Sequence, residues 1–309
     1  MKRNYILGSL WIVIALLLTF LLIKGFRGNK NTFSGIHNFS DWLENHVDND
    51  DWDSDDWDSE YYDYDGDDEN METIEASELA KNTTFEAFGI KTISTDLRTF
   101  PVEISKSSDS KIHIDFEGKA ENYCKLSHNG SEILVKEVKR KGGFNAHING
   151  KVYITLPETF DKELNIDNVS GSVKIYGIKA EEASIEAVSG SVSITDCDIK
   201  KAKVDTVSGS SKVSGNFEQL NIESVSGSIK AESGKALVEK CDFESVSGSI
   251  QLAIPANMGY SMEYETMSGS FKDEIAGVSG SKHGKYTHGS GNTEIEVSTM
   301  SGSIKIEER

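Results

Sequence analysis

Cysteine is scarce throughout this chain, and arginine and tryptophan are missing from most of its second half. The 309 residues include three cysteines, Cys124, Cys197 and Cys241. They show neither metal-ligand spacing nor a C-x-x-C pair, so they predict no disulfide framework and no metal site. Residues 161–308 contain no Arg and no Trp. Because polysaccharide cleavage needs a distinct carboxylate pair or cationic clamps, and sugars stack on aromatic rings, a glycan-cleaving enzyme is only a minor alternative.

Positive charge is also scarce, and its distribution excludes one class of partner. The net charge is −19, and residues 31–80 contain no Lys or Arg at all. That segment contributes −18 and residues 1–30 contribute +5, which leaves −6 for residues 81–309. Since no basic footprint is present, we expect no binding to nucleic acid.

A V-S-G-S element, by contrast, recurs down the second half of the chain. Its glycines follow one another at 18 to 21 residues, with one longer gap of 33, and are Gly171, Gly190, Gly209, Gly227, Gly248, Gly269 and Gly302. A fixed period of about 20 residues is typical of a solenoid, in which each turn buries its apolar face against its neighbours.

Apolar residues recur seven, five and two positions before each motif glycine and two positions after it. The set two positions before is Val169, Val188, Val207, Val225, Val246, Met267 and Met300. Because side chains alternate along a strand, these positions predict two short strands whose alternation slips between five and two before the glycine. The fold class predicted is all-β, a parallel β-solenoid of coils of about 20 residues.

The motif residues themselves allow more than one explanation. The glycine either faces inward where a Cβ has no room, or supplies a backbone angle that other residues resist. The flanking serines should point outward in columns. A catalytic serine needs a single activated copy beside a base, so serines repeated in every coil are predicted to be structural.

Two outward columns carry charge, and we consider both as candidate binding columns. Four positions before the glycine stand the acids Asp167, Glu186, Asp205, Glu223, Glu244 and Glu265. Three positions after it stand Lys174, Lys212, Lys230, Lys272 and Lys305, interrupted by Ser193 and Gln251. Stacked carboxylates repel unless paired, so either the lysine column compensates them or they attract cations, and a solvated, partly paired face is the simplest interpretation.

The N-terminal third predicts an anchor and a tether. In residues 1–30 an apolar run over about 6–23 is long enough to span a bilayer, and we favour an uncleaved anchor over a signal peptide. Residues 31–80 predict a disordered acidic tether, since residues 48–69 hold thirteen carboxylates. No resident cofactor is predicted, and the tether is either a hydrated spacer or a weak Ca²⁺ binder. Residues 81–160 predict an irregular β start with a hairpin at Asn129-Gly130, and residues 161–309 the repeats.

The segments V-Y-I-T-L-P…V-S-G-S-V-K-I and T-E-I-E-V-S-T-M-S-G-S-I-K-I resemble the LiaG-like adhesin family of bacterial cell-envelope proteins over residues 83–309. The resemblance implies an envelope-associated β-solenoid, often with one membrane helix, and it offers no catalytic residues to transfer.

Three functions follow as hypotheses. The first is a non-enzymatic, single-pass membrane protein whose solenoid lies outside the cell and binds an envelope polymer or protein. The second is a membrane-tethered regulatory scaffold in envelope-stress signalling, bound to a membrane signalling protein. The third is the glycan-cleaving solenoid.

Overall fold

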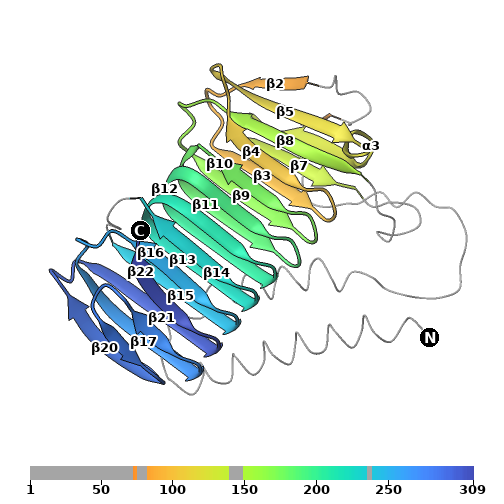
Figure 1. The fold of residues 1–309 in the computed structure, drawn as a ribbon. Coiled ribbons are helices and arrows are strands. Elements are labelled where there is room, and N and C mark those ends of the chain that lie inside the picture. Colours follow the sequence, from red (N-terminus) through yellow and green to blue (C-terminus); the bar gives the residue numbers. More distant parts are fainter. Residues whose placement is uncertain (1–71, 75–81, 139–148, 235–238) are drawn as a thin grey trace, which may run out of the picture. The chain divides into compact units, whose positions relative to one another are not determined.

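Strands make up most of the chain that this computed structural model describes, namely residues 72–74, 82–138, 149–234 and 239–309 (Figure 1). The first part contains one short helix, α3 (Ala120–Tyr123), and the strands β1 (Glu72–Ile74), β2 (Asn82–Glu86), β3 (Thr92–Leu97), β4 (Val102–Lys106), β5 (Lys111–Gly118), β6 (Cys124–His128), β7 (Glu132–Glu137) and β8 (Gly150–Leu156). The repeats form β9 (Glu163–Asn168), β10 (Val173–Tyr176), β11 (Lys179–Ala187), β12 (Val192–Ser208), β13 (Ser211–Ser226), β14 (Ile229–Ser233), β15 (Lys240–Ser247), β16 (Ile250–Ile254), β17 (Tyr260–Ser268), β18 (Phe271–Asp273), β19 (Val278–Gly280), β20 (His283–His288), β21 (Thr293–Ser301) and β22 (Ile304–Glu308).

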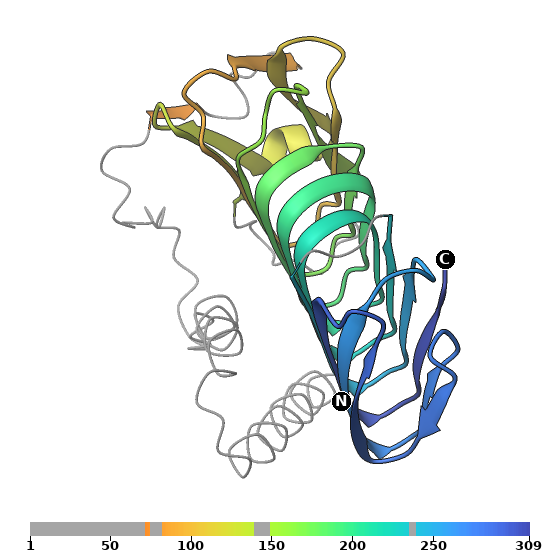
Figure 2. The same cartoon turned by 90° about the vertical axis from the view of Figure 1, so that its left-hand side faces the viewer.

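These strands build two stacks of parallel strands, one on each side of the V-S-G-S corner. The first stack contains the strands before the corner and runs in space β7, β3, β9, β11, β12, β13, β15, β21, β17. The second stack runs β8, β4, β10, β12, β13, β14, β16, β22, β18. Strands β12 and β13 pass from the second stack of one coil into the first stack of the next, and Figure 2 shows these turns one behind another. The predicted all-β, solenoid-like fold is confirmed.

The spatial order of the coils differs from their order in the sequence at both ends. Strand β21 lies between β15 and β17 (Figure 1). The coil that comes last in the sequence therefore lies in space between two coils that precede it in the sequence. At the other end, the coil of β7 and β8 stacks outside that of β3 and β4. Antiparallel strands then cover both ends, with β20 on β17 and β19 on β18 at one end. At the other end β6 pairs with β7 and β5 with β8, so no parallel edge strand of the described coils is left uncovered there.

The columns seven and five positions before the motif glycine, and two after it, face the core as predicted. The one polar member of these columns, Ser211, is buried like the others. The column two before the glycine does not. Met267 is 63% exposed, and four of the other six are only partly buried. Alternation instead continues inward to the third position before the glycine, which is buried in every repeat. These residues are Asn168, Ala187, Thr206, Ser224, Ser245, Thr266 and Thr299. The slip of alternation was predicted between the fifth and second positions before the glycine, but it falls after the third position. The prediction missed this because the inward residue at the third position is small or polar and does not look like core.

The motif glycines stack directly on one another at the corner. A Cβ on Gly209 would lie closer than 3.0 Å to the carbonyl oxygen of Gly190, and each of the others meets the preceding corner in the same way. None of the motif glycines has a positive φ. Of the two explanations for the glycine, close approach of backbones is the one that the geometry supports.

Buried polar groups connect the irregular first coils to the regular ones. The carboxylate of Glu137 accepts hydrogen bonds from the backbone N–H groups of Arg98 and Thr99, at 2.9 and 2.7 Å. The next corner is held by Asn168, whose Nδ2 donates to the carbonyl of Phe100 at 2.9 Å and whose Oδ1 accepts from Gly171 N–H at 2.6 Å. Since an unpaired buried N–H is costly, these two side chains stabilise corners that have no V-S-G-S neighbour.

The predicted membrane anchor and most of the predicted acidic tether lie outside the described residues. Among the residues described, no helix is long and apolar enough to cross a bilayer. Within residues 31–80, Glu72–Ile74 form β1 and pair antiparallel with β6, so this end of the predicted tether is a strand and not disordered. The hairpin predicted at Asn129-Gly130 joins β6 to β7.

Candidate binding surface

The serines on either side of each motif glycine form two columns along the outer corner of the solenoid. All seven serines that precede a motif glycine are exposed, and the seven that follow are exposed except for Ser172, which is half-buried. Some hydroxyls donate across to the next coil, as in Ser170 Oγ to the carbonyl of Arg98 at 2.8 Å. The corner is thus a hydroxyl surface whose rows repeat at the spacing of β-strands, about 4.8 Å.

The acidic column lies on the outer side of the first stack. Its register places Asp96, Asp167, Glu186, Asp205, Glu223 and Glu244 on consecutive strands. Glu265, which follows Glu244 in the repeats, does not follow it in space, because Ser298 of the inserted β21 lies between them. The acidic ladder is therefore continuous over six strands and starts one strand earlier than the V-S-G-S repeats, at Asp96.

Charge on this ladder is partly neutralised from within the first stack. The ammonium of Lys203 lies 2.8 Å from a carboxylate oxygen of Asp205, and Lys136 lies 3.5 Å from Asp96. Burial disfavours the charged form of Lys203, but the carboxylates of Asp205, Glu223 and Glu186 outweigh it and raise its pKa. Burial also raises the pKa of Asp205 above its ordinary value. The ladder is consequently a partly buried and partly paired face. It is less exposed to solvent than the solvated face that the sequence predicted.

The lysine column does not compensate the acids, because the two columns lie on different sides of the corner. Each of its lysines stands on the outer side of the second stack, in β10, β13, β14, β18 and β22. Lys272 pairs with Glu274 at 2.8 Å, and Lys305 lies 3.4 Å from the same carboxylate. Within the described chain, Lys174, Lys212 and Lys230 form no ion pair and are exposed.

An exposed aromatic side chain accompanies this column and was missed from the sequence. Tyr176 ends β10, two residues after Lys174, and is 57% exposed. Its cross-strand neighbours are Ser105 on β4 and Thr195 on β12, both too small to cover the ring. Repeat alignment gives no signal for it, because no other coil carries an aromatic residue at this position.

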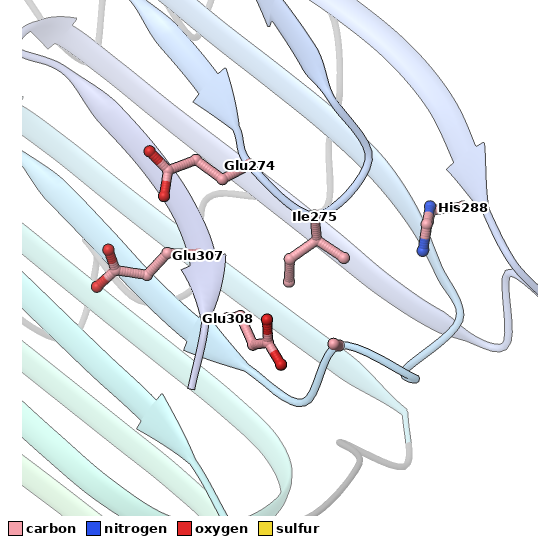
Figure 3. Close-up of a pocket in the computed structure, with 6 residues that line it drawn as sticks. Glu274, Ile275, His288, Glu307 and Glu308 are labelled. Atoms are coloured by element: carbon pink, nitrogen blue, oxygen red, sulfur yellow. The ribbon is translucent and has the colours of Figure 1, made fainter.

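A hollow near the C-terminal end holds several carboxylates (Figure 3). It has a volume of about 400 Å³ and is lined by Ala256, Glu274, Ile275, His288, Glu307 and Glu308. Hydrogen bonds from Lys272 and Lys305 lower the pKa values of Glu274 and Glu307 respectively. These acids are therefore already occupied by lysines, and the hollow offers no free anionic site at Glu274 or Glu307.

Nothing in the described part of the chain resembles a catalytic constellation. No group of three His, Cys, Asp or Glu side chains among these residues is placed to hold a metal ion. His283 and His288 lie at opposite ends of β20, opposite Glu265 and Tyr260. All three cysteines are free and buried, and burial raises the pKa of the Cys197 and Cys241 thiols, so neither is an activated nucleophile.

The match to a known family agrees with this architecture. Residues 90–307 match the model of the Toastrack DUF4097 family. Similar solved structures include a provisionally named cell adhesion protein from Clostridium sporogenes, 18% identical with a TM-score of 0.37 over 74% of this chain and 99% of that one. A provisionally named adhesin from Parabacteroides distasonis is 11% identical, with a TM-score of 0.41 over 74% of this chain and 96% of that one. A provisionally named lipid binding protein from the same organism is 16% identical, with a TM-score of 0.39 over 78% and 98%. No curated protein matches the chain.

Proposed function

This chain belongs to the Toastrack DUF4097 family. We propose that it is a non-enzymatic binding protein of the bacterial cell envelope. The adhesin-like family expected from the repeats is confirmed, whereas its assignment to the LiaG-like members stays a prediction. In this proposal the apolar run at 6–23 anchors the chain in the cell membrane, residues 31–71 act as a tether, and the solenoid lies outside the cell.

One observation carries the proposal, namely that the outer corner and the second stack present the same chemical groups again and again along one axis. Two serine columns and a lysine column repeat once per coil with few interruptions. An enzyme concentrates unique residues at one place, whereas a repeated surface suits a ligand that is itself long or repetitive. Function does not follow from fold alone, so the argument depends on this surface and not on the solenoid as such.

The location is tested by an epitope tag after Arg309. Intact cells expressing the tagged full-length chain are treated with protease or with antibody against the tag. We expect the tag to be accessible on intact cells. A tag that is reached only after lysis would place the solenoid in the cytoplasm and would overturn the adhesin-type function.

Binding is tested with the folded unit alone. Residues 72–309 form one compact unit, and this fragment should sediment with isolated cell envelopes of the source organism. A competing fraction of purified wall polymer or envelope protein then shows which component is bound. Failure to bind any envelope fraction would contradict the proposal.

A further inference from the structure

The lysine column is paired at its C-terminal end and unpaired in the described coils before it. At the C-terminal end, Lys272 and Lys305 are neutralised by Glu274 and Glu307, with Lys305 Nζ 2.6 Å from Glu307. Beside Lys174, the same register position on β4 is held by Glu103, which pairs with Lys151 on β8. The central lysines, Lys174, Lys212 and Lys230, have no such partner among the residues that the structure describes.

The reason lies in the residues two positions further along each strand. In the central coils these outward positions are Tyr176, Thr195, Ser214 and Glu232. Only one of them is an acid, and Glu232 is already bound by the guanidinium of Arg309 at 2.7 Å. Three ammonium groups therefore project from one strip of the second stack without an ion pair among the described residues, and the acid beside Lys174, Glu103 on β4, is paired with Lys151.

Tyr176 gives the strip a flat apolar surface beside its first lysine. Lys174 and Tyr176 are two residues apart on β10, so both side chains project from the same side of the strand. Tyr153, which also lies on the outer side of the second stack, makes an instructive contrast. Its hydroxyl donates to Glu117 at 2.6 Å, and the Nζ of Lys151 lies over its ring, 4.4 Å from the ring centroid. Tyr176 has neither contact and its ring is open to solvent.

We propose that this strip, made of Lys174, Tyr176, Lys212 and Lys230 with the serine column beside it, binds an anionic polysaccharide along the solenoid axis. This inference deepens the proposed envelope-binding function and rests on it. The open ring offers a stacking platform for a sugar face, the ammonium groups pair with acidic substituents, and the hydroxyls exchange hydrogen bonds with ring hydroxyls. Lys212 and Lys230 are on adjacent coils, about 4.8 Å apart, and Lys174 is two coils from Lys212, so the charges suit a repeating anion.

The acidic groups of such a polymer are either carboxylates on the sugars or phosphodiesters between them, and the strip accepts both. Nucleic acid fits less well, because single strands bind by stacking successive bases on several aromatic side chains and the strip offers a single aromatic ring. The combination of unpaired lysines, hydroxyl columns and one exposed aromatic ring therefore favours a glycan.

The test measures binding of residues 72–309 to three immobilised polymers at low and high salt. Polygalacturonate carries carboxylates, a phosphomannan carries phosphodiesters between its sugars, and dextran is the neutral control; single-stranded DNA is tested as a soluble competitor. We expect binding to at least one anionic polymer and none to dextran, and we expect Tyr176→Ala to weaken it about tenfold. Each of Lys174→Gln, Lys212→Gln and Lys230→Gln should weaken binding about two- to fivefold. That loss should vanish near 1 M salt, where charges are screened within about 3 Å.

Lys272→Gln is the matched control, because Lys272 stands in the same column but is already paired with Glu274. It should change the affinity less than about twofold. Unchanged circular dichroism and an unchanged urea midpoint show that each variant is folded. If the parent fragment binds an anionic polymer and the Tyr176 and central lysine variants bind equally well, this inference is overturned while the envelope-binding function stands. Binding to isolated envelopes without binding to either anionic polymer, or tighter binding to single-stranded DNA, also overturns it. Failure to bind isolated envelopes at all would remove the proposed function as well.

Discussion

Replacing one motif glycine by alanine tests the close stacking of the corners directly. Gly209 lies in a coil with neighbours on both sides, Gly190 before it and Gly227 after it. The new Cβ would come within 3.0 Å of the Gly190 carbonyl oxygen and would lie 3.0 Å from its carbon, whereas ordinary contacts begin at 3.4 Å. The two coils must therefore move apart locally by at least about 0.4 Å at the carbonyl carbon, and by more at the oxygen.

The energetic consequence follows from the hydrogen bonds that flank this corner. Ser208 N–H donates to the carbonyl of Val188 at 2.7 Å, and Val192 N–H donates to that of Ser210 at 3.1 Å. Overpacking in a tight interior costs about 1–3 kcal/mol, and each weakened hydrogen bond forfeits part of about 0.5–1.5 kcal/mol. We expect Gly209→Ala to lower the free energy of unfolding by about 2–4 kcal/mol.

Urea unfolding of the 72–309 fragment, followed by circular dichroism, measures the loss, and the midpoint should fall by about 1–2 M. Hydrogen exchange should accelerate first at the amides of Val192 and Ser208. Gly269→Ala is the matched control, because its coil is the last of the parallel stack and has a glycine corner on one side only, at Gly302. Among the described strands, only the antiparallel β20 and β19 lie on the outer side of that coil, and they can shift with it, so the loss should be about half as large. A loss below about 0.5 kcal/mol at Gly209, or an equal loss at both sites, would refute the steric argument.

Three further predictions concern the buried and titrating groups. Asn168→Ala should lower the free energy of unfolding by about 1–3 kcal/mol, because it leaves the buried N–H of Gly171 without its acceptor. Urea unfolding measures this loss, with Ser170→Ala as an exposed control. Equal midpoints for the two variants would contradict the role given to Asn168. Asp109 should titrate near pH 2, since hydrogen bonds, the largest from His113 and others from Lys111 N–H and Ser107, lower its pKa from 3.8 to about 2. Because the pKa of Asp109 is lower in the folded state, its contribution to stability is complete above about pH 4 and is lost as the pH falls towards 2. An NMR titration of Asp109 in the parent and in His113→Ala should show a higher midpoint in the variant. Identical midpoints would exclude the His113 contact as the cause. The three cysteines should react with a thiol reagent only after unfolding, and labelling of the native protein would contradict their burial.

Most of the coil could be predicted because its residues obey a local rule. Columns such as Ile166 and Ile185 alternate with charged residues, and alternation alone decides which face of a strand is buried. The rule failed at the third position before the glycine, where Ser224 and Ser245 are buried although they are polar. Hydropathy assigns such residues to the surface, whereas at a tight corner only a small side chain has room inside.

The candidate surface was predictable only in part, for a related reason. The glycine spacing located Lys174, Lys212 and Lys230 in one column, but it did not show which lysines the fold neutralises. Pairing depends on contacts between residues far apart in the chain, such as Arg309 with Glu232. The openness of Tyr176 likewise depends on small neighbours contributed by two other strands.

The sequence by itself determined the solenoid class, the coil length and the outward charged and serine columns, because period and alternation are properties of neighbouring residues. Only the tertiary structure decided the order of the coils, in which β21 enters between β15 and β17, and the separation of the acidic and lysine columns onto different sides of the corner. Strands with nearly the same pattern can stack in any order as far as local chemistry is concerned. Their actual order depends on which coil best covers the exposed edge of the next, and that is a long-range property of the whole stack.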